Sequence, residues 1–124
     1  MIEFNDHITR ELVQAETHKL FVFGDNLLRY GLGGQAKEMR GEPNTIGIIT
    51  KFCPAMTEGS FLNDEFYKRW LEVSANDILQ IFLFIYIVVW PKAGIGTGLA
   101  QLPKRAPTIF KTIELIKLKL EMTD

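Results

Sequence analysis

The sequence predicts an α/β protein, a three-layer α/β/α sandwich on a mostly parallel sheet. Strand-forming segments alternate along the chain with segments whose apolar residues recur at helical spacing. One segment, IFLFIYIVVW, is apolar almost throughout, which is typical of a strand buried on both faces of a parallel sheet. The 124 residues suffice for one hydrophobic core, so we expect a single domain over residues 1–124.

The first half of the chain predicts two helices and two strands. Asn5 or Asp6 is a suitable N-cap for the first helix. The run KLFVFG is compact, apolar and ended by glycine, as a buried strand would be. The expected elements are a helix over 5–16, a strand over 19–24, a helix over 35–40 and a strand over 45–49.

The second half predicts a helix, the central strand and a C-terminal helix. The helix begins at Asn63 or Asp64 and is expected to end near Asn76 or Gln80. The central strand then covers 81–90; the apolar run around it is shorter than the roughly 20 residues of a membrane-spanning helix. The last helix covers 103–122, with its prolines in the first turn and a buried stripe of Ile109, Ile113, Ile116 and Leu120.

Composition limits the classes of function. A net charge of −1 argues against a protein held to nucleic acid mainly by phosphate neutralisation. The single Cys53 and two histidines exclude an internal disulfide and the usual zinc sites, so we expect no metal and no cofactor. The N-terminus does not have the pattern of a secretory signal, and we expect a cytoplasmic protein that does not bind membranes.

Two glycine-rich segments follow predicted strands. GDNLLRYGLGGQAK carries Gly31, Gly33 and Gly34, and PKAGIGTGLAQLP carries three more glycines at alternating positions. Loops that follow parallel strands meet at the carboxyl edge of the sheet, where ligands bind. Glycine lets successive N–H groups converge on an anion, and a following helix adds partial positive charge. We therefore predict a phosphate-binding site between the two loops.

Neither segment fits the standard nucleotide signatures. G-x-x-x-x-G-K-[ST] is absent, and GIGTGLA lacks the third glycine of G-x-G-x-x-G. Gly31, Gly33 and Ala36 match G-x-G-x-x-A, but they lie too far beyond the strand for the usual tight first turn. A Walker ATPase and a dinucleotide-binding Rossmann domain are therefore disfavoured.

Both segments together resemble the macro domains, which bind ADP-ribose. Asn26 at a strand end, followed by the glycines of residues 31–34, is similar to the first macro-domain loop. The sequence IGTGLAQLPKRA is similar to the second, with proline and alanine at fixed spacing after Thr-Gly. The resemblance covers roughly residues 20–110 and extends to small bacterial and phage proteins distantly related to macro domains. The chain departs from the pattern at Gln101, where glycine is common, and at Asp25, where a small residue is usual.

The resemblance implies a site for ADP-ribose or a related nucleoside diphosphate sugar, free or attached to a macromolecule. It implies that the two glycine loops hold the diphosphate and the distal ribose, and that Asn26 bonds that ribose. Asp6 is a candidate for recognising adenine, with a helix cap as the alternative. The implied ligand-binding residues are Gly24, Asn26, Gly31, Gly33, Gly34, Gln35, Lys51, Gly94, Ile95, Gly96, Thr97, Gly98 and Leu99.

Hydrolysis of an ADP-ribosyl linkage needs an oriented water and a base, and the sequence leaves this activity open. Asp25 is the best candidate base, with Asn26 beside it to orient the water; the alternative for Asp25 is a solvated turn residue. Lys51 could meet a phosphate, act as an amine nucleophile or lie at the surface. The Thr97 hydroxyl could cap a helix or contact a phosphate, and Tyr30 could stack on a base or pack.

Two other classes of function stay open. PKAGIGTGL is similar to the P-G-G-x-G-T loop of Rossmann-like nucleoside-monophosphate phosphoribohydrolases, but the glutamate expected shortly after the threonine is missing. A non-catalytic protein that sequesters a nucleotide or binds a partner is the other alternative, because aromatic residues serve a core and an exposed patch equally well.

Overall fold

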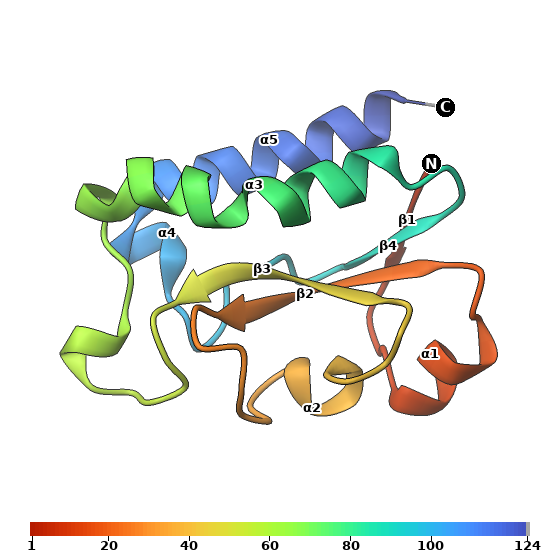
Figure 1. The fold of residues 1–124 in the computed structure, drawn as a ribbon, viewed down its shortest axis with the longest axis horizontal. Helices are drawn as coiled ribbons and strands as arrows, with labels where there is room; N and C mark the ends of the chain where they lie inside the picture. Colours follow the sequence, from red (N-terminus) through yellow and green to blue (C-terminus); the bar gives the residue numbers. More distant parts are fainter. Residues whose placement is uncertain (124) are drawn as a thin grey trace.

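The computed structural model describes residues 1–123 and contains one sheet of four strands (Figure 1). The strands are β1 (Ile2–Asn5), β2 (Leu20–Asn26), β3 (Thr45–Lys51) and β4 (Val88–Pro91), in the spatial order β1-β4-β2-β3. Each neighbouring pair is parallel. The predicted α/β class and parallel sheet are therefore confirmed, and the carboxyl ends of all four strands point the same way.

Helices cover both faces of this sheet. Helices α3 (Tyr67–Leu83) and α5 (Pro107–Met122) lie side by side on one face, while α1 (Arg10–Ala15) and α2 (Ala36–Met39) lie on the other (Figure 1). The short α4 (Leu102–Arg105) precedes α5, and the single 3-10 turns η1 (Glu58–Ser60) and η2 (Asp64–Phe66) precede α3.

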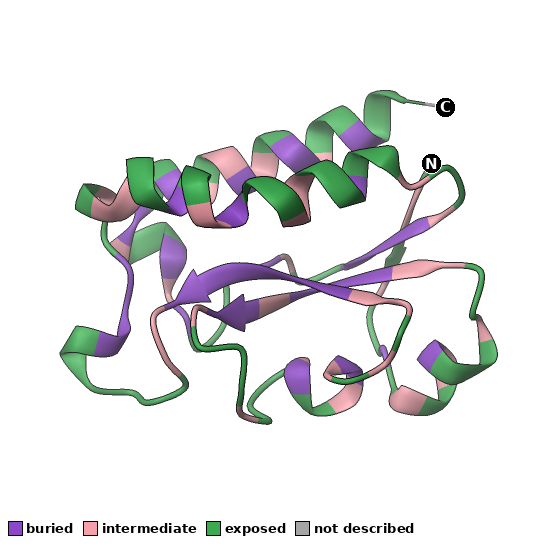
Figure 2. Cartoon of the chain, viewed as in Figure 1, coloured by how far each residue is buried: buried purple, intermediate pink, exposed green. Residues whose placement is uncertain are grey.

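Two apolar cores separate the layers. The larger packs α3 and α5 on the sheet around Trp70 and Trp90, and the smaller packs α1 and α2 around Phe21, Phe23 and Met39. Strands β2, β3 and β4 are mostly buried, as Figure 2 shows. The buried Trp70 indole also donates to the carbonyl oxygen of Ile49 at 2.8 Å, which ties α3 to β3.

The prediction of a long central strand over 81–90 is wrong. Helix α3 continues to Leu83, and β4 contains only four residues. The buried positions Trp70, Ser74 and Ile81 follow one helical stripe, so the helical period runs on into the apolar segment. Ile85, in the connection to β4, is 82% exposed. Within residues 1–123, no helix is both long enough and apolar enough to cross a bilayer.

The other boundaries differ from the predictions at functionally important places. Sequence patterns missed β1, and the first helix is capped by Thr9, whose hydroxyl accepts from the Leu12 N–H, rather than by Asn5 or Asp6. Strand β2 extends to Asn26 and β3 to Lys51, two residues beyond each predicted end. These extensions place four polar residues on rigid strand ends instead of in loops.

The predicted C-terminal helix is broken in two. Ala106 is non-helical (φ −145°, ψ 67°) because it precedes Pro107, and a residue before proline is disfavoured in the helical region. Helix α5 therefore starts at Pro107, where the Asp64 carboxylate accepts from the Thr108 and Ile109 N–H groups. The predicted stripe of Ile109, Ile113, Ile116 and Leu120 is buried.

Candidate functional site

A cavity of about 320 Å³ lies beyond the carboxyl ends of β2, β3 and β4. Two loops form much of its wall: the first glycine loop (residues 27–35) after β2, and the second glycine loop (residues 92–101) after β4. Pro54, in the connection that follows β3, completes the wall. Cavities of this size and place are typical of small-molecule sites in parallel α/β proteins.

The structure brings the sequence-predicted site residues to this one cavity. Its wall includes Gly24, Asp25, Asn26, Gly31, Gly33, Gly34, Gln35, Lys51, Gly94, Ile95, Gly96, Thr97, Gly98 and Leu99. Asp6, the adenine candidate, and Tyr30, the candidate for stacking on a base, also line it. Sequence reasoning missed Arg40, Thr50 and Pro54, because no motif distinguishes them from an ordinary helix end, strand residue and loop proline.

Both glycine loops offer backbone donors that the protein leaves free. Within residues 1–123, the N–H groups of residues 30–36 and 95–100 form no hydrogen bond to an acceptor of the chain. Ile95 is 1% exposed, and Ala36 and Ala100 are also buried. Because unpaired N–H groups in buried residues are costly, acceptors from outside the chain are expected there. The cavity wall is therefore rich in donors.

The glycines of the second loop serve two purposes. Gly94 (φ +94°) and Gly96 (φ +82°) adopt the left-handed backbone, and a Cβ on Gly96 would lie 2.4 Å from Leu102 Cδ1. These two glycines are needed for the loop to close. Gly98 and Gly33 have ordinary φ angles and no heavy atom within 4 Å of an added Cβ. Folding does not require glycine at these two positions, and both residues line the cavity.

Asn26 presents an acceptor that no group of the described chain satisfies. A β-bulge pairs Asp25 with Ile49 and Asn26 with Lys51, so β3 has an extra residue at this point. Asn26 is buried, with 7% of the residue exposed, and its Nδ2 donates to the Tyr30 carbonyl oxygen at 2.7 Å. Its Oδ1 is buried without a hydrogen-bond partner. A ligand donor, such as a hydroxyl group, would satisfy it.

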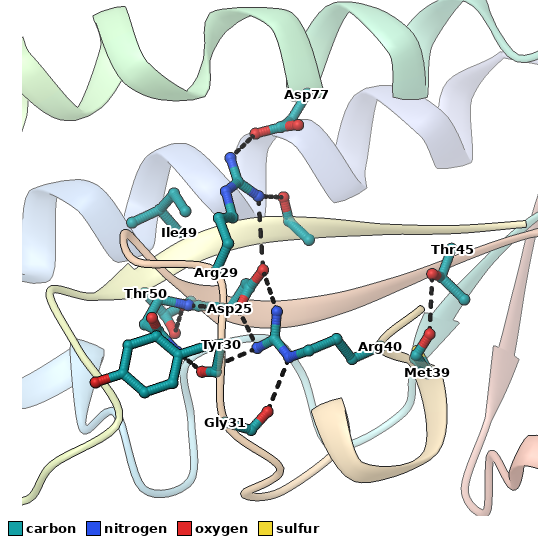
Figure 3. Close-up of polar contacts among 12 residues, drawn as sticks. Asp25, Arg29, Tyr30, Gly31, Met39, Arg40, Thr45, Ile49, Thr50 and Asp77 are labelled. Atoms are coloured by element: carbon teal, nitrogen blue, oxygen red, sulfur yellow. Dashed lines mark hydrogen bonds and ion pairs between the residues drawn. The ribbon is translucent and has the colours of Figure 1, made fainter. Parts of the chain in front are cut away.

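Asp25 is engaged by two arginines (Figure 3). Its Oδ1 lies 2.5 Å from Arg40 Nη2 and its Oδ2 lies 3.2 Å from Arg40 Nη1. Arg29 Nη1 is 3.6 Å from the same Oδ2, and Arg29 reaches on to Asp77 of α3 at 2.6 Å. A general base needs a free lone pair directed at its water. The role of Asp25 as base stays a prediction, and this geometry favours a structural task for it.

Lys51 is a buried cation without a carboxylate partner among residues 1–123. Its ammonium group donates to the Ala55 carbonyl oxygen at 2.5 Å and lies 4.8 Å from the centre of the Phe61 ring. Burial lowers the pKa of Lys51. The Ser60 hydroxyl, the Ala55 N–H and the charge of Lys51 in turn lower the pKa of the Cys53 thiol.

Two expected contributions to anion binding are smaller than the sequence suggested. The helices that follow the glycine loops, α2 and α4, contain four residues each, so their dipoles add little. The Thr97 hydroxyl donates to the Ala93 carbonyl oxygen at 2.7 Å and thus closes the second loop.

The Asp6 carboxylate is largely exposed and lies 3.8 Å from Lys92 Nζ. Residues 1–123 bring together no group of His, Cys, Asp or Glu that could hold a metal ion.

Comparison with known families identifies the chain at the family level. A model of a family of unknown function, DUF7831, matches residues 3–115. The chain belongs to this family. The matched residues, 3–115, include every residue named above as lining the cavity. No curated protein and no solved structure gives a significant match.

Substitution of a glycine with positive φ and of one with ordinary φ should affect stability differently. Gly96→Ala should destabilise the fold by at least about 1–2 kcal/mol, the cost of a left-handed backbone alone for a residue with a Cβ. Gly98→Ala should unfold at the same urea concentration as the wild type, because its Cβ meets no atom. Urea denaturation followed by tryptophan fluorescence measures both. Equal destabilisation by the two substitutions would contradict the conclusion that folding does not require glycine at position 98.

Proposed function

We propose that the protein binds a nucleoside diphosphate sugar of the ADP-ribose class in the cavity between the two glycine loops. One observation carries the proposal: consecutive free N–H groups on both loops line the same cavity. Phosphate oxygens accept hydrogen bonds and donate none, so they suit a wall of donors. The resemblance of both loops to macro domains supports the same ligand.

The remaining groups of the wall match the other parts of such a ligand. The free Oδ1 of Asn26 can accept from a sugar hydroxyl, which a phosphate cannot offer at neutral pH. Asp6, at the end of β1, can accept from the amino group of adenine. The wall contributed by residues 1–123 includes no glutamate, the residue that the phosphoribohydrolase pattern places shortly after the threonine.

Isothermal titration calorimetry with ADP-ribose tests the proposal. The wild type should show one binding site. Gly98→Ala should weaken binding about 10-fold or more, since a methyl group enters the ligand space while the fold is unchanged. Gly59→Ala is the matched control, because Gly59 also has an ordinary φ and no neighbour within 4 Å but lies away from the cavity. Absence of heat with ADP-ribose, NAD and related nucleotides would overturn the proposal.

A hydrolase acting on an ADP-ribosyl linkage is the second candidate, and Lys51 favours it. A lysine whose pKa is lowered by burial has a larger fraction of neutral, nucleophilic amine. The amine would attack C1 of the distal ribose while the bond to the leaving group breaks and that group takes a proton. Water would then release the ribose and restore the amine. Asp25, by contrast, has both carboxylate oxygens bound to Arg40.

The hydrolase extension has its own test. Lys51→Arg should keep ADP-ribose binding within a few-fold of the wild type and lose release of ADP-ribose from an ADP-ribosylated substrate by about 100-fold or more. Wild-type turnover should rise with pH through the lowered pKa of Lys51, because deprotonation creates the nucleophile. Chromatographic detection of free ADP-ribose measures both. If the wild type binds ADP-ribose but leaves such substrates intact, the protein is a binding module.

A further inference from the structure

We propose that Arg40 is a positioning residue: held by Asp25, it aims the free oxygen of Asn26 at the ligand and so selects nucleotides that carry a sugar beyond the diphosphate. This inference rests on the proposed function, because it concerns the same cavity. It assigns Asp25 to the support of the site, whereas the sequence pattern predicted a catalytic base.

The orientation of Asn26 is set by one neighbour. Its Nδ2 donates to the Tyr30 carbonyl oxygen at 2.7 Å, and a carbonyl oxygen can only accept. The amide therefore cannot be turned end for end without losing that hydrogen bond, and Oδ1 remains the group without a partner. The position of the Tyr30 carbonyl thus determines where the unpartnered Asn26 Oδ1 points.

Arg40 determines the position of that carbonyl. Its Nη2 lies 3.3 Å from the Tyr30 oxygen, and its Nε donates to the Gly31 carbonyl oxygen at 2.8 Å (Figure 3). A guanidinium group presents its donors in a rigid planar fork, so it can fix two successive carbonyls and a carboxylate at the same time. A lysine ammonium cannot reproduce this arrangement.

Asp25 closes the ring of contacts. Its carboxylate takes two hydrogen bonds from Arg40, and its Oδ1 also accepts from the Asn26 backbone N–H at 2.8 Å. Contacts therefore run from Asp25 to Arg40, to Tyr30, to the Asn26 side chain, and back through the Asn26 backbone. Gly47 makes room for the ring, since a Cβ there would lie 2.7 Å from Asp25 Cβ.

The ring acts more on the sugar end of the ligand than on the diphosphate. The free N–H groups of residues 95–100 lie on the second glycine loop, which has no hydrogen bond to Arg40. These N–H groups can donate to the oxygens of a diphosphate. The Asn26 oxygen needs a donor, and the distal sugar supplies hydroxyl groups. Loss of the ring should therefore weaken binding of ADP-ribose more than binding of ADP, which lacks the distal sugar.

Calorimetry with ADP-ribose and ADP on the same variants tests the inference. The wild type should prefer ADP-ribose. Arg40→Lys should weaken ADP-ribose binding about 10-fold, close to the strength of one hydrogen bond, and should weaken ADP binding several-fold less. Asn26→Ala should show the same pattern, and Arg40→Lys combined with Asn26→Ala should be no weaker than either alone. Arg69→Lys, in an exposed ion pair with Glu72, is the control and should change nothing.

The outcomes separate this inference from the proposed function. If the wild type binds neither nucleotide, the proposed function fails. If it binds ADP-ribose and Arg40→Lys weakens both nucleotides equally, or the double substitution is additive, Arg40 only stabilises the fold and the positioning role is overturned. If Arg40→Lys does not fold, the double variant Asp25→Asn with Arg40→Met replaces it. This variant removes the guanidinium group without leaving the Asp25 carboxylate unpaired, and it should show the same loss of preference for ADP-ribose over ADP.

Discussion

The shape of the first glycine loop depends on one ion pair, between Asp25 on β2 and Arg40 at the end of α2. The Asp25 side chain is 3% exposed and that of Arg40 20% exposed, so the carboxylate is buried and the guanidinium group is partly buried. Loss of Arg40 would leave a buried carboxylate without its bidentate partner, which is destabilising. Both residues line the cavity, so the pair positions the first glycine loop there as well as stabilising the fold.

The two walls of the cavity are held in different ways. The second glycine loop is fixed by its own backbone and short contacts: the Leu102 N–H donates to the Gly96 carbonyl oxygen, and the Gly94 N–H to that of Pro91. The first loop has few such contacts and is held by side chains, above all Arg40. Arg29 belongs to the same loop, and its positive φ of 60° shows that the chain is strained there. The second loop is therefore the preformed wall, and the first is the wall whose geometry can be altered by substitution.

Much of this site could be predicted from sequence, because glycine spacing and polar residues at strand ends are local signals. The parallel sheet, both loops and the place of Asn26 beside the first loop follow from such signals, whereas the extension of β2 to Asn26 and of β3 to Lys51 does not. The ring around Arg40 could not be predicted, since it joins residues from β2, the first loop and α2 through side-chain geometry alone. The segment over 81–90 misled for a related reason: its apolar residues fit a buried strand, but Phe82, Leu83, Ile85 and Tyr86 are exposed and only the last part is a strand.

A crystal structure of the protein soaked with ADP-ribose would show whether the two glycine loops bind this nucleotide. We expect diphosphate oxygens within hydrogen-bond distance of N–H groups of residues 95–98, and a hydroxyl group of the distal ribose bonded to Asn26 Oδ1. We also expect the hydrogen bonds between Asp25 and Arg40 to persist in the complex. A cavity left empty at saturating ligand, or a diphosphate bound away from the second glycine loop, would show that the two loops do not form an ADP-ribose site.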